Sequence, residues 1–414
     1  TLDLDGINQT WNGTFIGTGG GVVRHVGGTI SAGVVGATLN FGPGMFQIDG
    51  DPNLSGGVFT NIGSLSIVGG HANLNATLNN LGLVTQSAGR LDFFQGTPTV
   101  NNSGVWQVTV TGDGEFLGNF SNAESFNNTG TLLRDGTALA TTGNVAFSNT
   151  GVVEVVGGSL RIDSPLSQLA GGVLSGGTWW VNAGATLTLP GNVTTNNGTV
   201  ELAGDAPQLD AIATNNGSLT LSGGRDFTRN GLFTNAGTLT IGAGSVFTAQ
   251  SFTQAVSGTT VFQIAGATPA DFGVLSVATS ATLNGIGRVE VVGGFEPAAG
   301  NNFAVMTFGS RTGDFATFEG LRLGRETAFE RVFDPTAMRI NSLADAANLD
   351  VASITVPAGG TAGLPVVFSY TVENVSAFPT TASSWVDSIY LSLDGVLDAG
   401  DKLITRVTHT GTVA

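Results

Sequence analysis

The stretch Phe59-Thr-Asn-Ile-Gly-Ser-Leu-Ser-Ile67 decides the fold, because the chain repeats it many times. Each copy contains a large apolar residue, an Asn and a Gly, followed by alternating apolar and small polar residues. Clear copies begin at Phe126, Phe147 and Phe233, and weaker copies surround Asn80, Asn102, Asn196 and Asn215. An Asn-Gly turn that feeds a short alternating strand, recurring along the chain, indicates a repeat protein.

The spacing of the copies predicts the architecture. The marker residues are Asn61, Asn80, Asn102, Asn128, Asn149, Asn196, Asn215 and Asn235. Most steps between them are close to 20 residues, and the long step after Asn149 equals two periods, with the missing turn in the Gly-Gly stretch 171–181. This period predicts an all-β fold, a parallel β-helix (β-solenoid) of roughly 20-residue coils.

The repeat also predicts which side chains form the core. Alternate residues, such as Leu65 with Ile67 and Leu239 with Ile241, should point inward and stack from coil to coil. We expect Asn and Gly at the corners, where left-handed backbone angles suit them. The Asn side chains of successive coils could form a hydrogen-bonded ladder.

Composition excludes several classes of protein. Charged residues make up 11% of the 414 residues and hydrophobic residues 41%, which argues against disorder. The net charge is −16 and the single Lys is Lys402, so the basic patch that nucleic-acid binding needs is absent from the sequence. There is no Cys, and no apolar run is long enough for a membrane helix.

Changes in sequence pattern and composition divide the chain into four parts. We expect the β-helix over 1–254, terminal coils with a charged cap over 255–340, a linker over 341–348 and a separate module over 349–414. In the second part, Pro297-Ala-Ala-Gly-Asn-Asn-Phe-Ala-Val-Met-Thr-Phe308 and Gly313-Asp-Phe-Ala-Thr-Phe318 resemble the C-terminal end of bacterial autotransporter and filamentous-haemagglutinin-like β-helices. Arg and Glu residues gather here, as expected for a polar cap over an open sheet edge.

The last part has alternating strands separated by turns, which predict an antiparallel sandwich. Tyr370-Thr-Val-Glu-Asn374 and Trp385-Val-Asp-Ser-Ile-Tyr-Leu-Ser392 closely resemble the bacterial cell-adhesion-related domain, an immunoglobulin-like module. The resemblance covers 349–414, which is shorter than such a module, so we expect a partial domain. It implies a secreted or cell-surface bacterial protein.

Catalytic motifs are scarce. The three histidines, His25, His71 and His409, are far apart in sequence and are interpreted as solvated or turn-lining. Parallel β-helices can carry polysaccharide lyases and hydrolases, and the best carboxylates for that chemistry are Asp205, Asp210 and Asp226, with Arg225 and Arg229 nearby. Because no aromatic residues accompany them, we interpret them as scattered surface charges.

The loop after Ser392 contains the best metal candidates. Asp394, Asp398 and Asp401 could supply carboxylate oxygens to calcium, the only cofactor that the sequence suggests. Asp-Gly turns between strands explain the same residues without a metal.

The sequence leaves two possible functions open. The first is a structural or adhesive extracellular rod without enzyme activity, which associates end to end or binds cell-surface or matrix components, including glycans. The alternative is a polysaccharide-active β-helix enzyme. Ice binding fits poorly, because Thr-x-Thr pairs do not recur in every coil.

Overall fold

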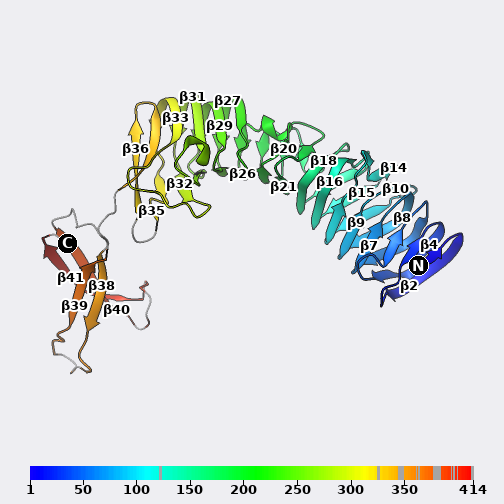
Figure 1. Ribbon diagram of the computed structural model, residues 1–414, viewed down its shortest axis with the longest axis horizontal. Helices are drawn as coiled ribbons and strands as arrows, with labels where there is room; N and C mark the ends of the chain where they lie inside the picture. Colours follow the sequence, from blue (N-terminus) through cyan, green and yellow to red (C-terminus); the bar gives the residue numbers. More distant parts are fainter. Residues whose placement is uncertain are drawn as a thin grey trace.

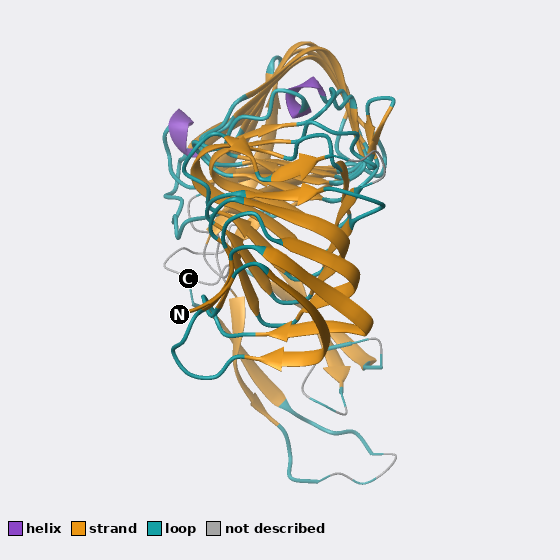
Figure 2. Ribbon diagram, turned by 90° about the vertical axis from the view of Figure 1, so that its right-hand side faces the viewer, coloured by secondary structure: helices purple, strands orange, loops and turns teal. Residues whose placement is uncertain are grey.

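A computed structural model of the chain describes residues 1–120, 124–323, 327–343, 349–359, 361, 364–375, 384–392, 394, 397–398 and 400–411. Its main part is a parallel β-solenoid of about 12 turns, so the predicted all-β fold is confirmed. Figure 1 shows the coils stacked side by side from the N-terminus to β36. Figure 2 shows the strands aligned in walls, with loops gathered along the edges.

One wall, which we call sheet A, runs along the whole solenoid. Its strands are β1 (Leu2–Leu4), β3 (Val23–His25), β5 (Phe46–Ile48), β7 (Ser64–Ile67), β9 (Leu83–Gln86), β12 (Val105–Val108), β13 (Gly114–Glu115), β16 (Thr131–Thr141), β18 (Val152–Arg161), β21 (Thr178–Val181), β22 (Thr186–Thr188), β24 (Thr199–Leu202), β26 (Ser218–Leu221), β28 (Thr238–Ile241), β30 (Thr259–Ile264), β32 (Ile286–Val291) and β34 (Thr317–Glu319).

Two further walls divide the length of the solenoid between them. Sheet B contains β2 (Ile7–Ile16), β4 (Gly28–Asn40), β6 (Asn53–Asn61), β8 (His71–Asn80), β10 (Arg90–Phe93), β11 (Thr99–Asn102), β14 (Leu117–Asn119), β15 (Ser125–Asn128) and β17 (Ala146–Asn149). Sheet C contains β19 (Leu169–Ala170), β20 (Val173–Leu174), β23 (Thr195–Asn196), β25 (Thr214–Asn215), β27 (Phe227–Asn235), β29 (Val246–Gln254), β31 (Val274–Leu283), β33 (Asn302–Gly313), β35 (Arg322–Leu323), β36 (Thr327–Asp334) and β37 (Ala337–Ser342). Two short 3-10 helices, η1 (Leu209–Ala211) and η2 (Pro269–Asp271), interrupt the coils.

The core consists of apolar columns in register. In sheet A, Leu65 pairs with Val84 and Val84 with Trp106, and all three are fully buried. In sheet B, Phe126 pairs with Phe147, and their rings stack with centroids 5.5 Å apart. The inward residues predicted from the repeat are therefore confirmed, since a strand's alternate side chains share one face.

The marker Asn residues form the predicted ladder inside the solenoid. Within each of two segments, the Asn Nδ2 donates to the Asn Oδ1 of the next coil, and each marker Asn also donates to a backbone carbonyl. The side-chain bonds, 2.6 to 2.9 Å long, join Asn61, Asn80, Asn102, Asn128 and Asn149 in one segment and Asn196, Asn215 and Asn235 in a second. Because these side chains are buried, the ladder satisfies polar groups that would otherwise be costly.

The ends of the two ladder segments are set by the residues that replace Asn. Leu39 occupies the position before Asn61, whose buried Oδ1 has no hydrogen-bond partner among the described residues. Leu174 pairs with Asn196 and separates the two segments, in the stretch where the sequence predicted the missing turn. Gln254 ends the second segment by accepting from Asn235 at 3.1 Å.

The prediction that these Asn and Gly residues adopt left-handed backbone angles is wrong. All positive φ angles among the described residues belong to Gly, so the marker Asn residues are not left-handed, and neither is the Gly that follows most of them. That Gly is needed for another reason. A Cβ on Gly104 would lie 2.1 Å from the Gly82 carbonyl oxygen, and one on Gly130 would lie 2.2 Å from the Gly104 oxygen. The glycines therefore stack where neighbouring backbones come closest.

The C-terminal end of the solenoid changes from parallel to antiparallel pairing. Strand β37 pairs antiparallel with β33 and with β36, and their apolar side chains complete the core. The charges of the expected cap pair with one another: Arg331 contacts Asp314 at 2.8 Å, and Arg339 contacts Asp334 at 2.5 Å. Arg325 and Glu326, also assigned to the cap, lie outside the described residues.

The remaining strands form two small antiparallel sheets that fit a sandwich-like piece. Strand β38 (Leu349–Thr355) pairs with β39 (Ser369–Asn374), and β40 (Ser384–Leu391) pairs with β41 (Lys402–Thr410). Tyr370 joins the two sheets through its hydroxyl, which lies 3.1 Å from both Asp387 and His409. Asn341 and Ser342 of the expected linker belong to β37, residues 344–348 lie outside the described residues, and the four boundaries stay predictions.

Candidate functional site

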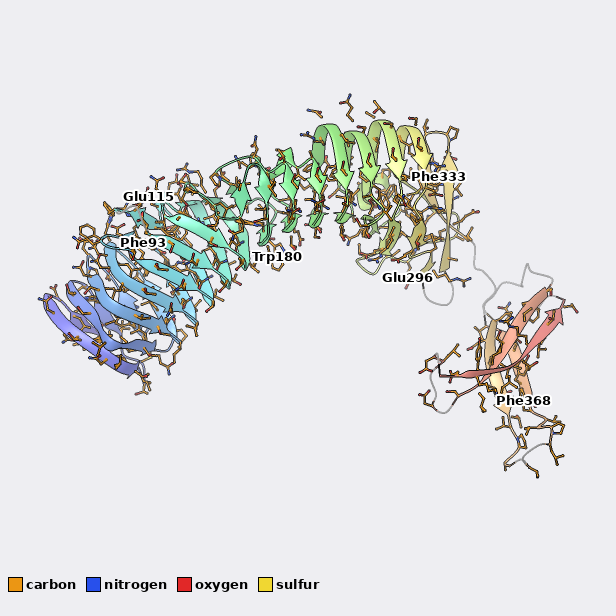
Figure 3. The ribbon with its side chains drawn as sticks, turned by 180° about the vertical axis from the view of Figure 1, so that it is seen from behind. Phe93, Glu115, Trp180, Glu296, Phe333 and Phe368 are labelled. Carbon is orange, nitrogen blue, oxygen red and sulfur yellow. The ribbon has the colours of Figure 1, made fainter. Side chains whose placement is uncertain are left out.

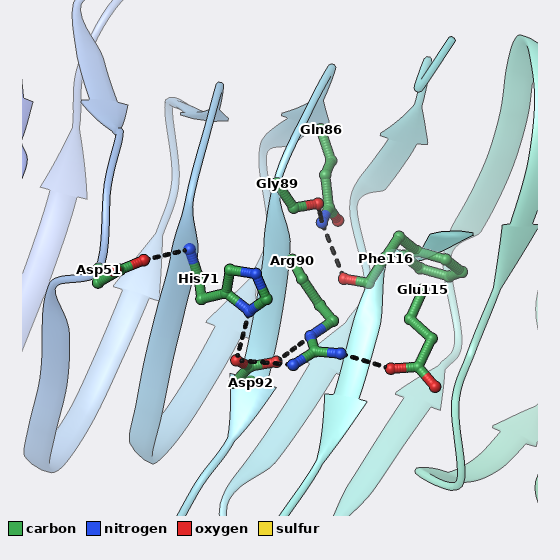
Figure 4. Close-up of polar contacts among 8 residues, drawn as sticks. All are labelled: Asp51, His71, Gln86, Gly89, Arg90, Asp92, Glu115 and Phe116. Carbon is green, nitrogen blue, oxygen red and sulfur yellow. Dashed lines mark hydrogen bonds and ion pairs between the residues drawn. The ribbon is translucent and has the colours of Figure 1, made fainter. Parts of the chain in front are cut away.

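A cluster of charged side chains from β8 and β10 of sheet B and β13 of sheet A lies on the outside of the solenoid, in its N-terminal half. It consists of His71, Arg90, Asp92 and Glu115, and we call it the Arg90 cluster. Figure 3 places Glu115 near Phe93 along the solenoid, and Figure 4 shows the four side chains in a row. Because Arg90 pairs with His71 in the parallel register, one coil step brings the two residues together.

Asp92 is the centre of the cluster. Its side chain is only 4% exposed, and its two oxygens bind different partners. Oδ1 accepts from Arg90 Nε at 2.5 Å, and Oδ2 lies 3.1 Å from His71 Nδ1. A buried carboxylate needs such partners, and an ionised one can only accept, so His71 donates from Nδ1 and its Nε2 stays open to another partner.

Arg90 connects Asp92 to Glu115. Its Nη1 donates to Glu115 Oε2 at 2.7 Å (Figure 4). Burial alone would lower the pKa of Arg90, but the hydrogen bonds and charges of Asp92 and Glu115 outweigh burial and raise that pKa above its usual value. The guanidinium is therefore permanently charged and fixed in position.

Gly118 makes this arrangement possible. It pairs with Asp92 on the next coil, and a Cβ there would lie 2.1 Å from Asp92 Oδ1 and 2.6 Å from Arg90 Nε. Any larger residue would displace both side chains. The sequence pattern around Gly118 carries no repeat phrase, so this requirement was not visible before the coils were aligned.

An open hollow of about 370 Å³ adjoins the cluster. His71, Arg90 and Glu115 line one part of it, and the loop 110–114 lines the other. Asp51 accepts a hydrogen bond from the His71 backbone N–H at 2.9 Å, and Asp113 accepts from Leu139 N–H at 2.8 Å. With Asp92 and Glu115, these carboxylates outnumber the Arg90 guanidinium, so the hollow is negative.

The carboxylates proposed from the sequence for sugar chemistry are only partly brought together. Arg225 contacts Asp210 at 2.6 Å. Asp226 instead accepts a hydrogen bond from the Val246 backbone at 2.9 Å. Arg229 Nε is buried and has no hydrogen-bond partner among the described residues. The side chains of Asp210, Arg225 and Asp226 therefore mainly bind other groups of the solenoid.

The candidate calcium ligands lie between β40 and β41. Asp401 Oδ2 accepts from the Asp398 backbone N–H at 2.9 Å, and Asp398 Oδ1 accepts from Gly400 N–H at 2.6 Å, as in a turn. Asp394 contacts Ser392. Among the described residues no group of three His, Asp or Glu side chains could hold a metal ion. The calcium site stays a prediction. Calorimetry of the full chain with calcium and with a chelator tests it, and unchanged melting would rule it out.

The histidines differ from the sequence-based interpretation. His25 is fully buried in sheet A, between Leu4 and Ile48 in the register, and its ring nitrogens have no hydrogen-bond partner among the described residues. Burial lowers its pKa to about 4. His71 belongs to the Arg90 cluster, and His409 lies 2.7 Å from Asp387.

Comparison with known proteins adds no identification. The sequence matches no protein-family model and no curated protein. Among the described residues, the helices are too short and too polar to cross a membrane. The described residues therefore form a parallel β-solenoid that carries the Arg90 cluster on its outer surface.

Proposed function

We propose that the chain is a structural or adhesive rod, secreted by bacteria or displayed on their surface. The observation that carries the proposal is the continuous interior of the solenoid. Apolar columns and the Asn ladder run through successive coils, so each coil is fixed by its two neighbours. Such a stack resists bending and presents long flat walls, which suits a protein that spans distance or displays binding surfaces.

The sequence resemblances support the same role. The terminal coils resemble those of autotransporter and filamentous-haemagglutinin-like proteins, and the last strands resemble a cell-adhesion-related, immunoglobulin-like module. The paired sheets β38–β39 and β40–β41 are compatible with such a module. The partners that this role implies are cell-surface or matrix components, including glycans.

End-to-end association is the second element of the proposal. The apolar side chains of the last four strands face a hollow of about 870 Å³, and many of them are exposed. Exposed strands with apolar faces recruit further strands. A second copy of the chain could fill this role in a filament, and a further part of a large adhesin could fill it in a single rod.

A polysaccharide-active enzyme is the alternative, and one observation favours it. Asp92 holds the His71 imidazole in a fixed orientation, with the Glu115 carboxylate on the far side of Arg90. A general base and a second carboxylate are the groups that such chemistry uses. Incubation with polysaccharides and measurement of new reducing ends or unsaturated products tests this alternative, with Glu115→Gln as the inactive control.

The location of the chain on or inside the cell tests the proposal that it is a surface rod. Antibodies against the chain should label intact bacteria as strongly as permeabilised ones. Labelling that requires permeabilisation would overturn the proposal, because an adhesive or structural surface role needs an exposed protein.

A further inference from the structure

Two exposed aromatic rings lie beside the Arg90 cluster. Among the described residues of the solenoid, the exposed aromatic side chains are Phe94, at 42% exposure, and Phe120, at 54%. Phe94 follows β10 and Phe120 follows β14, and their ring centroids are 5.9 Å apart at an angle of 51°. Exposure of two adjacent Phe rings to water is unfavourable unless another molecule covers them.

Arg90 joins this aromatic pair to the polar cluster. Its guanidinium carbon lies 5.2 Å from the centroid of the Phe120 ring while its nitrogens bind Asp92 and Glu115. Gly118 leaves the space through which Arg90 crosses from one coil to the next. The aromatic pair and the cluster therefore form one surface, to which β8, β10, β13 and β14 contribute.

Two polar atoms of this surface are open to a ligand. Glu115 Oε2 binds Arg90, and Oε1 makes no hydrogen bond with a described residue. His71 has an exposed side chain and presents Nε2, because Nδ1 is held by Asp92. Both atoms can form hydrogen bonds with hydroxyl groups, which can donate or accept, and both have fixed positions because their neighbouring atoms are bound.

We propose that this surface binds a neutral oligosaccharide. A hexose has an apolar C–H face that can cover a Phe ring, and hydroxyl groups at its rim that can donate to Glu115 Oε1 and form a hydrogen bond with His71 Nε2. The excess of carboxylates around Arg90 repels uronic acids and other anionic sugars. This inference rests on the proposed adhesive function and specifies one partner class, neutral glycans, and the surface that binds them; a rod that does not bind them would still satisfy the test of location.

Affinity electrophoresis of the full chain in gels containing neutral polysaccharides tests the proposal. The probes are mannan, galactomannan, xyloglucan, dextran and amylose, with polygalacturonate as the anionic probe. We expect at least one neutral polysaccharide to retard the chain, and polygalacturonate not to. Phe120→Ala and Phe94→Ala should each weaken the retardation about fivefold to tenfold, since each removes one stacking face.

Controls separate loss of binding from loss of fold. Leu232 is exposed to a similar degree, at 51%, on a distant coil, so Leu232→Ala should bind as the unaltered chain does. Phe120→Ala should keep the circular dichroism spectrum and melting temperature, because the ring is on the surface. The proposal is overturned if none of the five neutral probes is bound, if polygalacturonate alone is bound, or if both Phe variants bind normally.

Discussion

Asn102 Nδ2 donates to Asn128 Oδ1 at 2.7 Å, and the same amide nitrogen donates to the Thr131 carbonyl at 3.0 Å. One side chain therefore satisfies both a neighbouring side chain and the backbone of the next coil. Asn102 also accepts from Asn80 at 2.6 Å, so it is buried with both ends of its amide in use. The ladder is the polar counterpart of the apolar columns.

Replacing Asn102 by Ala should destabilise the solenoid strongly. It leaves a donor on Asn80 and the acceptors Asn128 Oδ1 and Thr131 O without their partner, at a cost of about 2–4 kcal/mol in the free energy of unfolding. Asn101 is the matched control, because it bonds to Asn79 and Asn127 on the outer, half-buried face. Asn101→Ala should cost about 1 kcal/mol or less. Urea unfolding measures both, and equal losses would contradict the role given to the ladder.

Replacing Gly104 by Ala tests the close approach of coils. The added Cβ would meet the Gly82 carbonyl oxygen at 2.1 Å, so the two coils must separate. We expect a loss of about 3 kcal/mol in the free energy of unfolding. Gly112→Ala is the control, because a Cβ there meets nothing within 4 Å and its φ is not positive. If both variants melt at the same temperature, the glycines are not required for stacking.

His25 should make the solenoid less stable in acid. Burial lowers the pKa of His25 to about 4 in the folded chain, against the usual 6.5. Between these values the unfolded chain binds a proton that the folded chain does not, so stability falls as pH decreases from about 6.5 to about 4. The full effect is about 3 kcal/mol.

The measurement is the urea midpoint at pH 7 and at pH 4.5, for the unaltered chain and for His25→Leu. Carboxylates also titrate in this range, but they contribute to both proteins and cancel in the comparison. The variant should lose less stability on acidification than the unaltered chain. An equal loss in both would show that His25 does not titrate as its burial implies.

The repeat phrase was sufficient to predict the coils, their inward residues and the Asn ladder. Each of these depends on residues one period apart, and the phrase gives the period directly. The reason why Gly recurs at positions such as Gly104 and Gly130 was not predictable in the same way. Their need for a missing Cβ comes from the distance between backbones of adjacent coils, which the local sequence does not encode.

The Arg90 cluster was not predicted either. His71 and Asp92 are separated by about one period, and that signal was available. Phe120 and Gly118, however, follow a longer coil with the loop 110–114, where the repeat phrase is blurred. Aligning them with Arg90 required the register of β10 and β14. The sequence instead singles out Asp205, Asp210 and Asp226 as the carboxylates best suited to polysaccharide chemistry, and their interpretation as scattered surface charges rests on the lack of accompanying aromatic residues.

Immunogold electron microscopy of native material tests most directly whether the chain is, as proposed, a rod at the bacterial surface. The account predicts gold particles on slender projections or filaments of constant width that extend from the cell. Uniform filaments would indicate end-to-end stacking, and separate rods a segment of a larger adhesin. Gold confined to compact, isolated particles or to the cell interior would contradict the account.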